Sequence, residues 1–101
     1  MRKFYAGIVL NKEELKESSC NRIELEYYKI SKKCQRNVGK KTNLYGIEIV
    51  KKEYFGRQHL KEKENIYNIT NDETVIDNLL QVLRRNKVTP VSLNDIIEEV
   101  L

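Results

Sequence analysis

The sequence is short of the residues that build specialised sites: its 101 residues include one histidine, two cysteines, one proline and no tryptophan. Four glycines are also too few for a collagen-like or Pro/Gly-rich disordered chain. The longest N-terminal apolar stretch, residues 4–10, is far below the roughly 20 residues that span a bilayer. Length and composition therefore predict one small soluble globular domain over residues 1–101, with no membrane partner.

The cysteines and the N-terminal stretch bear on the cellular compartment. Cys20 and Cys34 form neither a metal-binding spacing nor a disulfide framework. Residues 4–10 are too short for the core of a signal peptide, and the polar segment Asn11-Lys12-Glu13-Glu14 follows without a cleavage site. We therefore expect a cytoplasmic protein with reduced thiols.

Residues capable of catalysis are scarce. His59, the sole histidine, lies beside the charged residues 61–64, which is typical of a surface histidine rather than of a base or metal ligand. The acidic pairs at 13–14 and 98–99 are adjacent, so their side chains diverge. Residues 39–42, Gly-Lys-Lys-Thr, lack the upstream glycine of a phosphate-binding loop. We expect no enzyme, no catalytic residue, no metal and no cofactor.

Alternating hydrophobicity predicts four strands in the first two thirds of the chain. They cover residues 4–10, 22–30, 44–49 and about 58–69, and Ile23, Leu25 and Tyr27 share one face. The connections are too short for helical crossovers, so the strands form an antiparallel meander. The alternation slips at residues 28–30, which predicts a bulge there. Gly46 suits a bulge or a close approach by another backbone.

The periodicity becomes helical after Thr70. A capping box from Thr70 to Glu73 starts a helix over about 72–86, and Asn86 is its expected left-handed stop. A second helix over 92–101 begins at an N-cap Ser92. The fold class is therefore α+β, ββββαα, with both helices packed on one face of the sheet. The expected core consists of Ile23, Leu25, Ile47, Ile49, Val75, Leu79, Leu83, Ile96 and Ile97.

Positive charge is concentrated in the first part of the chain. Residues 1–61 hold 15 Lys/Arg against 7 Asp/Glu, and the stretch from Lys29 to Lys41 contains no acid. Because so many cations repel one another and cannot all be buried, we interpret residues 31–43 as an exposed, mobile loop. Its field attracts acidic partners, although a merely solubilising segment is the simpler alternative. The candidate partner-binding surface is Lys32, Lys33, Arg36, Lys40 and Lys41.

The same stretch raises nucleic acid as an alternative partner. Tyr27 and Tyr28 precede the lysines, and aromatics beside cations are used by platforms that stack single-stranded bases. A core Tyr27 with Tyr28 at the rim explains the pattern equally well. The C-terminal helix carries acids and no cation, so it would repel phosphates rather than read a groove.

Three segments together resemble a known family. They are residues 45–49 (Tyr-Gly-Ile-Glu-Ile), 66–70 (Ile-Tyr-Asn-Ile-Thr) and 86–93 (Asn-Lys-Val-Thr-Pro-Val-Ser-Leu). The chain resembles, over about residues 44–101, a family of short uncharacterised proteins from clostridia and related spore-formers. The first 43 residues resemble it only in being strand-rich. The resemblance implies a small bacterial cytosolic protein and assigns no ligand or catalytic residue.

The sequence therefore favours a non-enzymatic protein-interaction or regulatory module of a bacterial cytosol, whose partner is another protein with an acidic surface. The alternative is a nucleic-acid-binding protein that uses the basic sheet and loop. A homodimer is a further open alternative.

Overall fold

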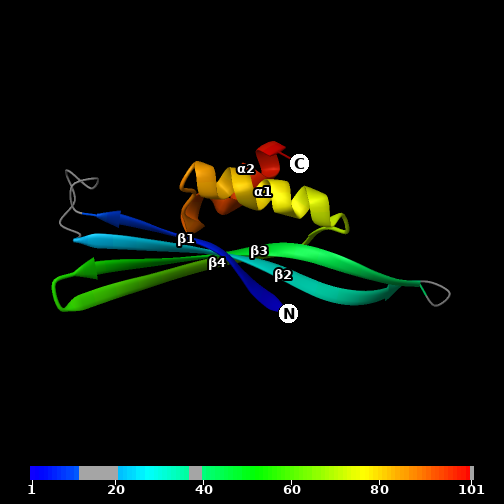
Figure 1. Cartoon of the computed structure of the whole chain (residues 1–101), viewed down its shortest axis with the longest axis horizontal. Coiled ribbons are helices and arrows are strands. Elements are labelled where there is room, and N and C mark those ends of the chain that lie inside the picture. Colours follow the sequence, from blue (N-terminus) through cyan, green and yellow to red (C-terminus); the bar gives the residue numbers. More distant parts are fainter. Residues whose placement is uncertain (12–20, 37–39, 101) are drawn as a thin grey trace.

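The computed structural model describes residues 1–11, 21–36 and 40–100, with the backbone alone at 34–36, 40–41 and 100. One antiparallel sheet has the strand order β1-β2-β3-β4, and two helices lie together on one of its faces (Figure 1). The predicted α+β fold is thereby confirmed. The elements are β1 (Arg2–Asn11), β2 (Arg22–Arg36), β3 (Lys40–Phe55), β4 (Gln58–Thr70), α1 (Glu73–Arg85), the 3₁₀ turn η1 (Pro90–Ser92) and α2 (Leu93–Val100).

The molecule is elongated, with extents of 55 × 26 × 18 Å. Strands β2 and β3 have 15 and 16 residues, which at about 3.3 Å per residue span most of the longest extent. Helix α1 has only 13 residues and covers about 20 Å. The helices therefore cover the middle of the sheet, and β2 and β3 extend past them at both ends (Figure 1). Neither helix among the described residues has the length and apolar character to cross a membrane.

The core lies between the sheet and α1. Most of the predicted core positions are buried or pack against the buried cluster. The prediction that Val75 belongs to the core is wrong, because its side chain is 37% exposed. It lies about 100° around the helix from Ile76, which takes its place in the core. The buried cluster consists of Leu25, Tyr27, Tyr45, Ile47, Ile49, Ile76, Leu79, Leu80, Leu83, Val88, Leu93 and Ile97, with Ile23 and Ile96 partly buried against it.

Tyr27 is fully buried, and its hydroxyl donates a hydrogen bond of 2.9 Å to the Val88 carbonyl oxygen beyond α1. Burial raises the pKa of Tyr27 to about 12, whereas tyrosine in an unfolded chain ionises near pH 10. Folding thus favours the neutral phenol, and this contribution to stability is complete below about pH 10 and is lost as the pH rises toward 12.

Tyr27→Phe is expected to lower the free energy of unfolding by about 0.5–1.5 kcal/mol at neutral pH, because the Val88 carbonyl loses its partner. Above about pH 10 the variant is spared the ionisation penalty, so this difference should shrink or reverse. Urea unfolding of both proteins at about pH 7 and about pH 11 measures it. If the unfolding free energies of the wild type and the variant fall in parallel between about pH 7 and about pH 11, the raised pKa of Tyr27 is contradicted.

The irregularities of the sheet differ in part from those expected. The ladder between β1 and β2 shifts by one residue between Phe4 and Ala6, so the bulge is in β1 and not at residues 28–30. Strand β2 keeps its alternation there: Lys29 points to α1, and Tyr28 contacts Phe4 on the other face. The pattern looked broken because a lysine occupies a helix-facing position, where it is paired with carboxylates.

Gly46 confirms the predicted close approach of another backbone. A Cβ atom at this position would lie 2.3 Å from the Ile66 carbonyl oxygen of β4. The β3–β4 ladder is irregular here, with Tyr45 opposite Thr70 and Ile47 opposite Ile66. The additional residues lie on β4, where Asn68 adopts a positive φ of 57°.

The helix boundaries correct three details of the prediction. Asp72, not Thr70, caps α1 by accepting a hydrogen bond of 2.9 Å from the Thr74 amide, and Glu73 binds Lys29 instead of reaching back. The left-handed residue after α1 is Lys87, with φ 52°, because Asn86 has φ −93°. The chain enters α2 through η1, so Ser92 ends a 3₁₀ turn rather than standing alone as an N-cap.

Candidate functional site: a basic two-stranded arm

One end of β2 and β3 extends beyond the rest of the sheet. On the β1 side, pairing stops where Met1 bonds to Ser31, and on the β4 side it stops where Tyr45 faces Thr70. Beyond these points β2 and β3 pair only with each other. We call residues 32–36 and 40–44 the basic arm. The arm projects past the helices at one end of the molecule (Figure 1).

All five predicted site residues lie on the arm, but on strands rather than on a loop. Residues 31–36 and 40–43 are in β2 and β3, and only residues 37–39, with the expected turn at Gly39, fall outside the described residues. The loop prediction is therefore wrong for the described part. Lys32 and Lys33 lie on opposite faces of β2 and are both exposed, so this part of the strand lacks the apolar alternation that identifies a half-buried strand.

The register brings the cations of the arm onto two adjacent strands. Lys32 lies opposite Leu44, Lys33 opposite Asn43, and Arg36 opposite Lys40. The side chains of Lys32 and Lys33 are exposed. Residues 32–36 and 40–44 contain no Asp or Glu, so the positive charge of the arm is not neutralised within its own sequence. Like charges on directly opposed residues also destabilise a strand pair.

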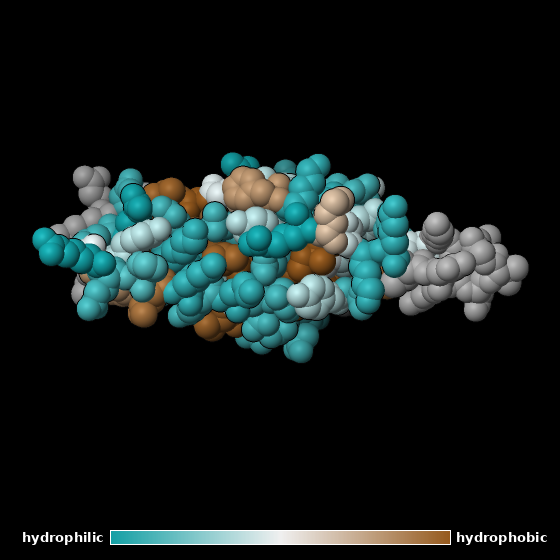
Figure 2. All heavy atoms as spheres, turned by 90° about the horizontal axis from the view of Figure 1, so that it is seen from below, coloured by the Kyte–Doolittle hydropathy of each residue, from teal (hydrophilic) through white to brown (hydrophobic). Residues whose placement is uncertain are grey.

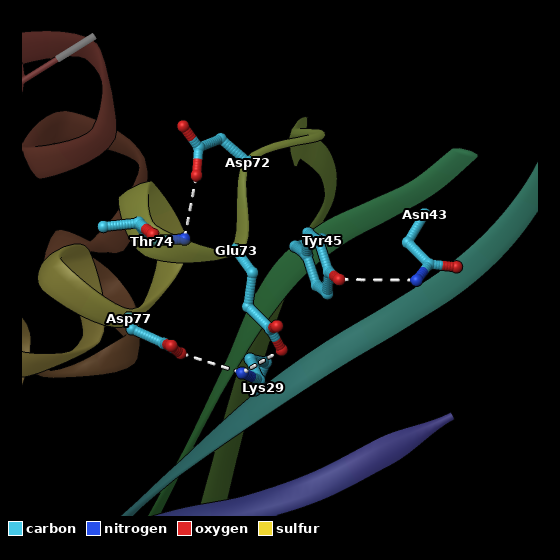
Figure 3. A network of polar contacts seen from close by, with 7 residues as sticks. All are labelled: Lys29, Asn43, Tyr45, Asp72, Glu73, Thr74 and Asp77. Atoms are coloured by element: carbon cyan, nitrogen blue, oxygen red, sulfur yellow. Dashed lines mark hydrogen bonds and ion pairs between the residues drawn. The ribbon is translucent and has the colours of Figure 1, made fainter.

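Lys29, at the base of the arm, behaves differently from the cations beyond it. Its ammonium lies 2.8 Å from both the Glu73 and the Asp77 carboxylates and ties β2 to α1 (Figure 3). Burial alone would lower the pKa of Lys29, but hydrogen bonds to Asp77 and Glu73 raise it above its usual value. Lys29 is thus a structural cation, and the charge available to a partner begins at Lys32.

A groove runs along the base of the arm. One part, of about 290 Å³, lies between β2, β3 and the start of α1, and a second part of about 480 Å³ continues toward the arm. Asn43 and Tyr45 lie side by side along β3 here, joined by a long hydrogen bond of 3.4 Å (Figure 3). The two parts share Met1, Ser31 and Asn43, and the second part is also lined by Lys32 and Lys33. The first part also contains the Glu73 carboxylate, which is paired with Lys29, whereas the second part combines cations with hydroxyl and amide groups, which suits carboxylate or other anionic ligands.

The tyrosines beside the basic stretch are both engaged. Tyr27 belongs to the core, as the simpler explanation required. Tyr28 lies on the face opposite the helices, with the Arg2 guanidinium 3.5 Å from its ring centroid and the ring centroid of Phe4 5.6 Å away in a T-shaped arrangement. Tyr27 offers no surface for a stacked base, and Arg2 already lies over the ring of the half-buried Tyr28, which weakens the case for a single-strand platform.

Sequence reasoning missed Glu48, a carboxylate only 5% exposed at the centre of this second face. It forms ion pairs with Arg2 and, at 3.8 Å, with Lys63. Each partner comes from a different strand, so nothing in the spacing along the sequence indicated them. Figure 2 shows this face as mainly hydrophilic, with a few apolar groups among the charged ones. Its charges neutralise one another, in contrast to those of the arm.

The residues considered for catalysis are dispersed. His59 is exposed near the β3–β4 turn, at the opposite end of the sheet from the arm. Cys20 lies outside the described residues, and only the backbone of Cys34 is described. Within residues 1–11, 21–36 and 40–100, no group of three or more His, Cys, Asp or Glu side chains could hold a metal ion.

Fold and site together define the class of protein: a small α+β domain whose antiparallel sheet is covered on one face by two helices and extended by a basic arm. The chain belongs to a family of unknown function, DUF6514, whose pattern matches residues 7–101. The match is wider than the predicted 44–101 and includes most of the first strand. No curated protein and no solved structure matches the chain.

Proposed function

We propose that this chain is a non-enzymatic protein-interaction or regulatory module of the bacterial cytoplasm, which binds an acidic surface of another protein through the basic arm. The observation that carries the proposal is the placement of five cations, without an acid, on two paired strands that the helices leave uncovered. The electrostatic field of these cations extends about 8–10 Å from the arm at ordinary ionic strength, so it can attract an approaching acidic partner.

The energetics of the arm support an acidic partner. Arg36 lies opposite Lys40 in the register, and like charges at opposed positions disfavour strand pairing. Carboxylates placed between them would remove this repulsion and add charge-assisted hydrogen bonds. The groove at the base, with Ser31 and Asn43 beside Lys33, supplies neutral donors that can fix the orientation of such carboxylates.

Nucleic acid is the alternative that the same charges allow. It would need exposed aromatic faces to stack bases, but Tyr27 is buried and the Tyr28 ring is already in contact with Arg2. Protein carboxylates need no stacking surface, so we favour them.

Reversing the charge of the arm is expected to weaken binding of an acidic probe. The probe is a fluorescent decaglutamate peptide, and its anisotropy is measured with the wild-type chain and with Lys32→Glu/Lys33→Glu. We expect the dissociation constant to rise about tenfold or more in the variant, with a melting temperature near that of the wild type. Added salt should weaken the wild-type complex, mainly by slowing association.

Arg57→Glu/Lys61→Glu is the matched control, because it changes the net charge equally at the other end of the sheet, where both residues are exposed. It should leave the affinity within a factor of about two to three. If both variants lose affinity for the peptide equally, the change in net charge explains the loss, and an arm-specific site is contradicted. Tighter binding of a single-stranded DNA oligonucleotide than of the peptide would favour the nucleic-acid alternative.

A further inference from the structure

The two edges of the sheet are protected to different degrees. Strand β4 carries the charged run Lys61-Glu62-Lys63-Glu64 and is kinked at Asn68, and both features discourage pairing with another strand. Strand β1 forms the other edge and has no charged residue from Phe4 to Leu10. Phe4 and Val9 are 55% and 53% exposed. An exposed apolar edge of this kind is a template for a further strand.

The hydrogen-bond pattern shows which backbone groups β1 offers. Met1 and Ser31 exchange both of their backbone hydrogen bonds, at 2.6 and 2.8 Å, so the odd-numbered residues of β2 direct their backbone groups toward β1. Beyond the bulge, Ile8 faces Leu25 and therefore bonds inward. The alternation leaves the N–H and C=O groups of Gly7 and Val9 pointing away from β2, toward an edge that no other strand of residues 1–11, 21–36 and 40–100 pairs with.

A hollow lies on each side of this edge. On the helix side, a cleft of about 340 Å³ is lined by Ile8 and by Gln81, Arg84, Arg85 and Lys87 at the end of α1. On the other side, a cleft of about 240 Å³ is lined in part by Phe4, Gly7 and Val9, with Glu24 and Glu26 beside them. These two glutamates are already paired with Arg22 and Lys52. The helix side is thus cationic and the other side mainly apolar.

We propose that the β1 edge is a second docking site, which accepts an extended segment of another protein as a fifth strand. Backbone hydrogen bonds to Gly7 and Val9 supply affinity, and the two clefts select side chains that alternate along the added strand. Carboxylates point toward Arg84 and Arg85, and apolar side chains point toward Phe4 and Val9. This proposal is independent of the basic arm.

Charge also argues against a second copy of the chain as the occupant. Two β1 strands that pair antiparallel are related by a two-fold axis perpendicular to the sheet, so both α1 helices would lie on the same face. Arg84 and Arg85 of each copy line the cleft beside this seam and would face their own counterparts. Such like-charge contacts oppose association, whereas a carboxylate-bearing strand relieves them.

The test uses an acetylated octapeptide of alternating glutamate and valine, with a lysine–valine octapeptide as the control probe. The glutamate peptide is expected to bind and to slow amide hydrogen exchange at Gly7 and Val9. Val9→Pro removes the outward N–H without removing a bond to β2, so it should weaken binding about tenfold or more and keep the wild-type spectrum. Val9→Ile retains both the N–H and an apolar side chain and should bind like the wild type.

Two further variants separate the possible outcomes. Arg84→Gln/Arg85→Gln should also weaken binding, which keeps the test valid if Val9→Pro disturbs the fold. Because the basic arm also attracts acidic peptides, Lys32→Glu/Lys33→Glu is read by amide exchange: the glutamate peptide should still slow exchange at Gly7 and Val9, and loss of this slowing would move the peptide to the basic arm and overturn the proposal. Equal binding of the lysine peptide would overturn it as well. A wild-type dimer that Val9→Pro converts to a monomer would assign the edge to a second copy instead.

Discussion

Replacing Gly46 with alanine should remove a large part of the stability of the sheet. The added Cβ would lie 2.3 Å from the Ile66 carbonyl oxygen and 3.0 Å from the Tyr67 Cα. Both are backbone atoms, so no side-chain rotation relieves the overlap and β4 must move away from β3. We expect the free energy of unfolding to fall by about 3 kcal/mol or more, which corresponds to a drop of roughly 12–24 °C in melting temperature.

Gly7→Ala is the matched control in the same sheet. A Cβ at Gly7 would have Phe4 Cζ at 3.5 Å as its nearest neighbour, which is an ordinary contact. The melting temperature should therefore change little, by an amount equivalent to about 0.5 kcal/mol or less. Similar small effects at both glycines, measured by thermal unfolding, would show that the strands do not approach at Gly46 as described.

Truncating Leu80 to alanine is expected to have an effect of the same order. Leu80 is fully buried at the centre of the face that α1 packs against the sheet. The substitution removes three carbon atoms and leaves a cavity that the surrounding strands cannot close. The expected loss is roughly 2–5 kcal/mol in the free energy of unfolding, measured by urea denaturation.

Val75→Ala tests the same helix on its other side. Val75 is 37% exposed, so its truncation should cost less than about 1 kcal/mol. The comparison decides between the observed helix orientation and the one predicted from sequence, in which Val75 belonged to the core. Equal losses at Val75 and Leu80 would favour the predicted orientation.

Periodicity was sufficient to predict the elements of the fold. Strict alternation at Ile23, Leu25 and Tyr27 and the helical stripe at Leu79 and Leu83 reflect burial on one face, which is what such patterns record. The error at Val75 arose because the apolar stripe of α1 is wider than its buried part. Periodicity identifies the face of a helix, but the packing partner sets its rotation.

The candidate site was predictable in composition and not in conformation. The cations from Lys32 to Lys41 were visible as a charge pattern, but a strand in which the neighbours Lys32 and Lys33 are both exposed leaves no apolar alternation. The bonds of Lys29 to Asp77 and of Arg2 to Glu48 join residues more than forty positions apart. Spacing along one chain holds no information on such pairs.

The basic arm is a direct continuation of the covered part of the sheet, because β2 and β3 are continuous. Both strands pass without interruption from beneath α1 into the arm, and their register stays constant from Arg22 to Arg36. No hinge separates the described part of the arm from the core. A partner bound at the arm would therefore be held at an angle to the helices that is set by the twist of the sheet rather than by a linker. Its distance from the helices and its orientation toward them would in this way be fixed by the sheet itself.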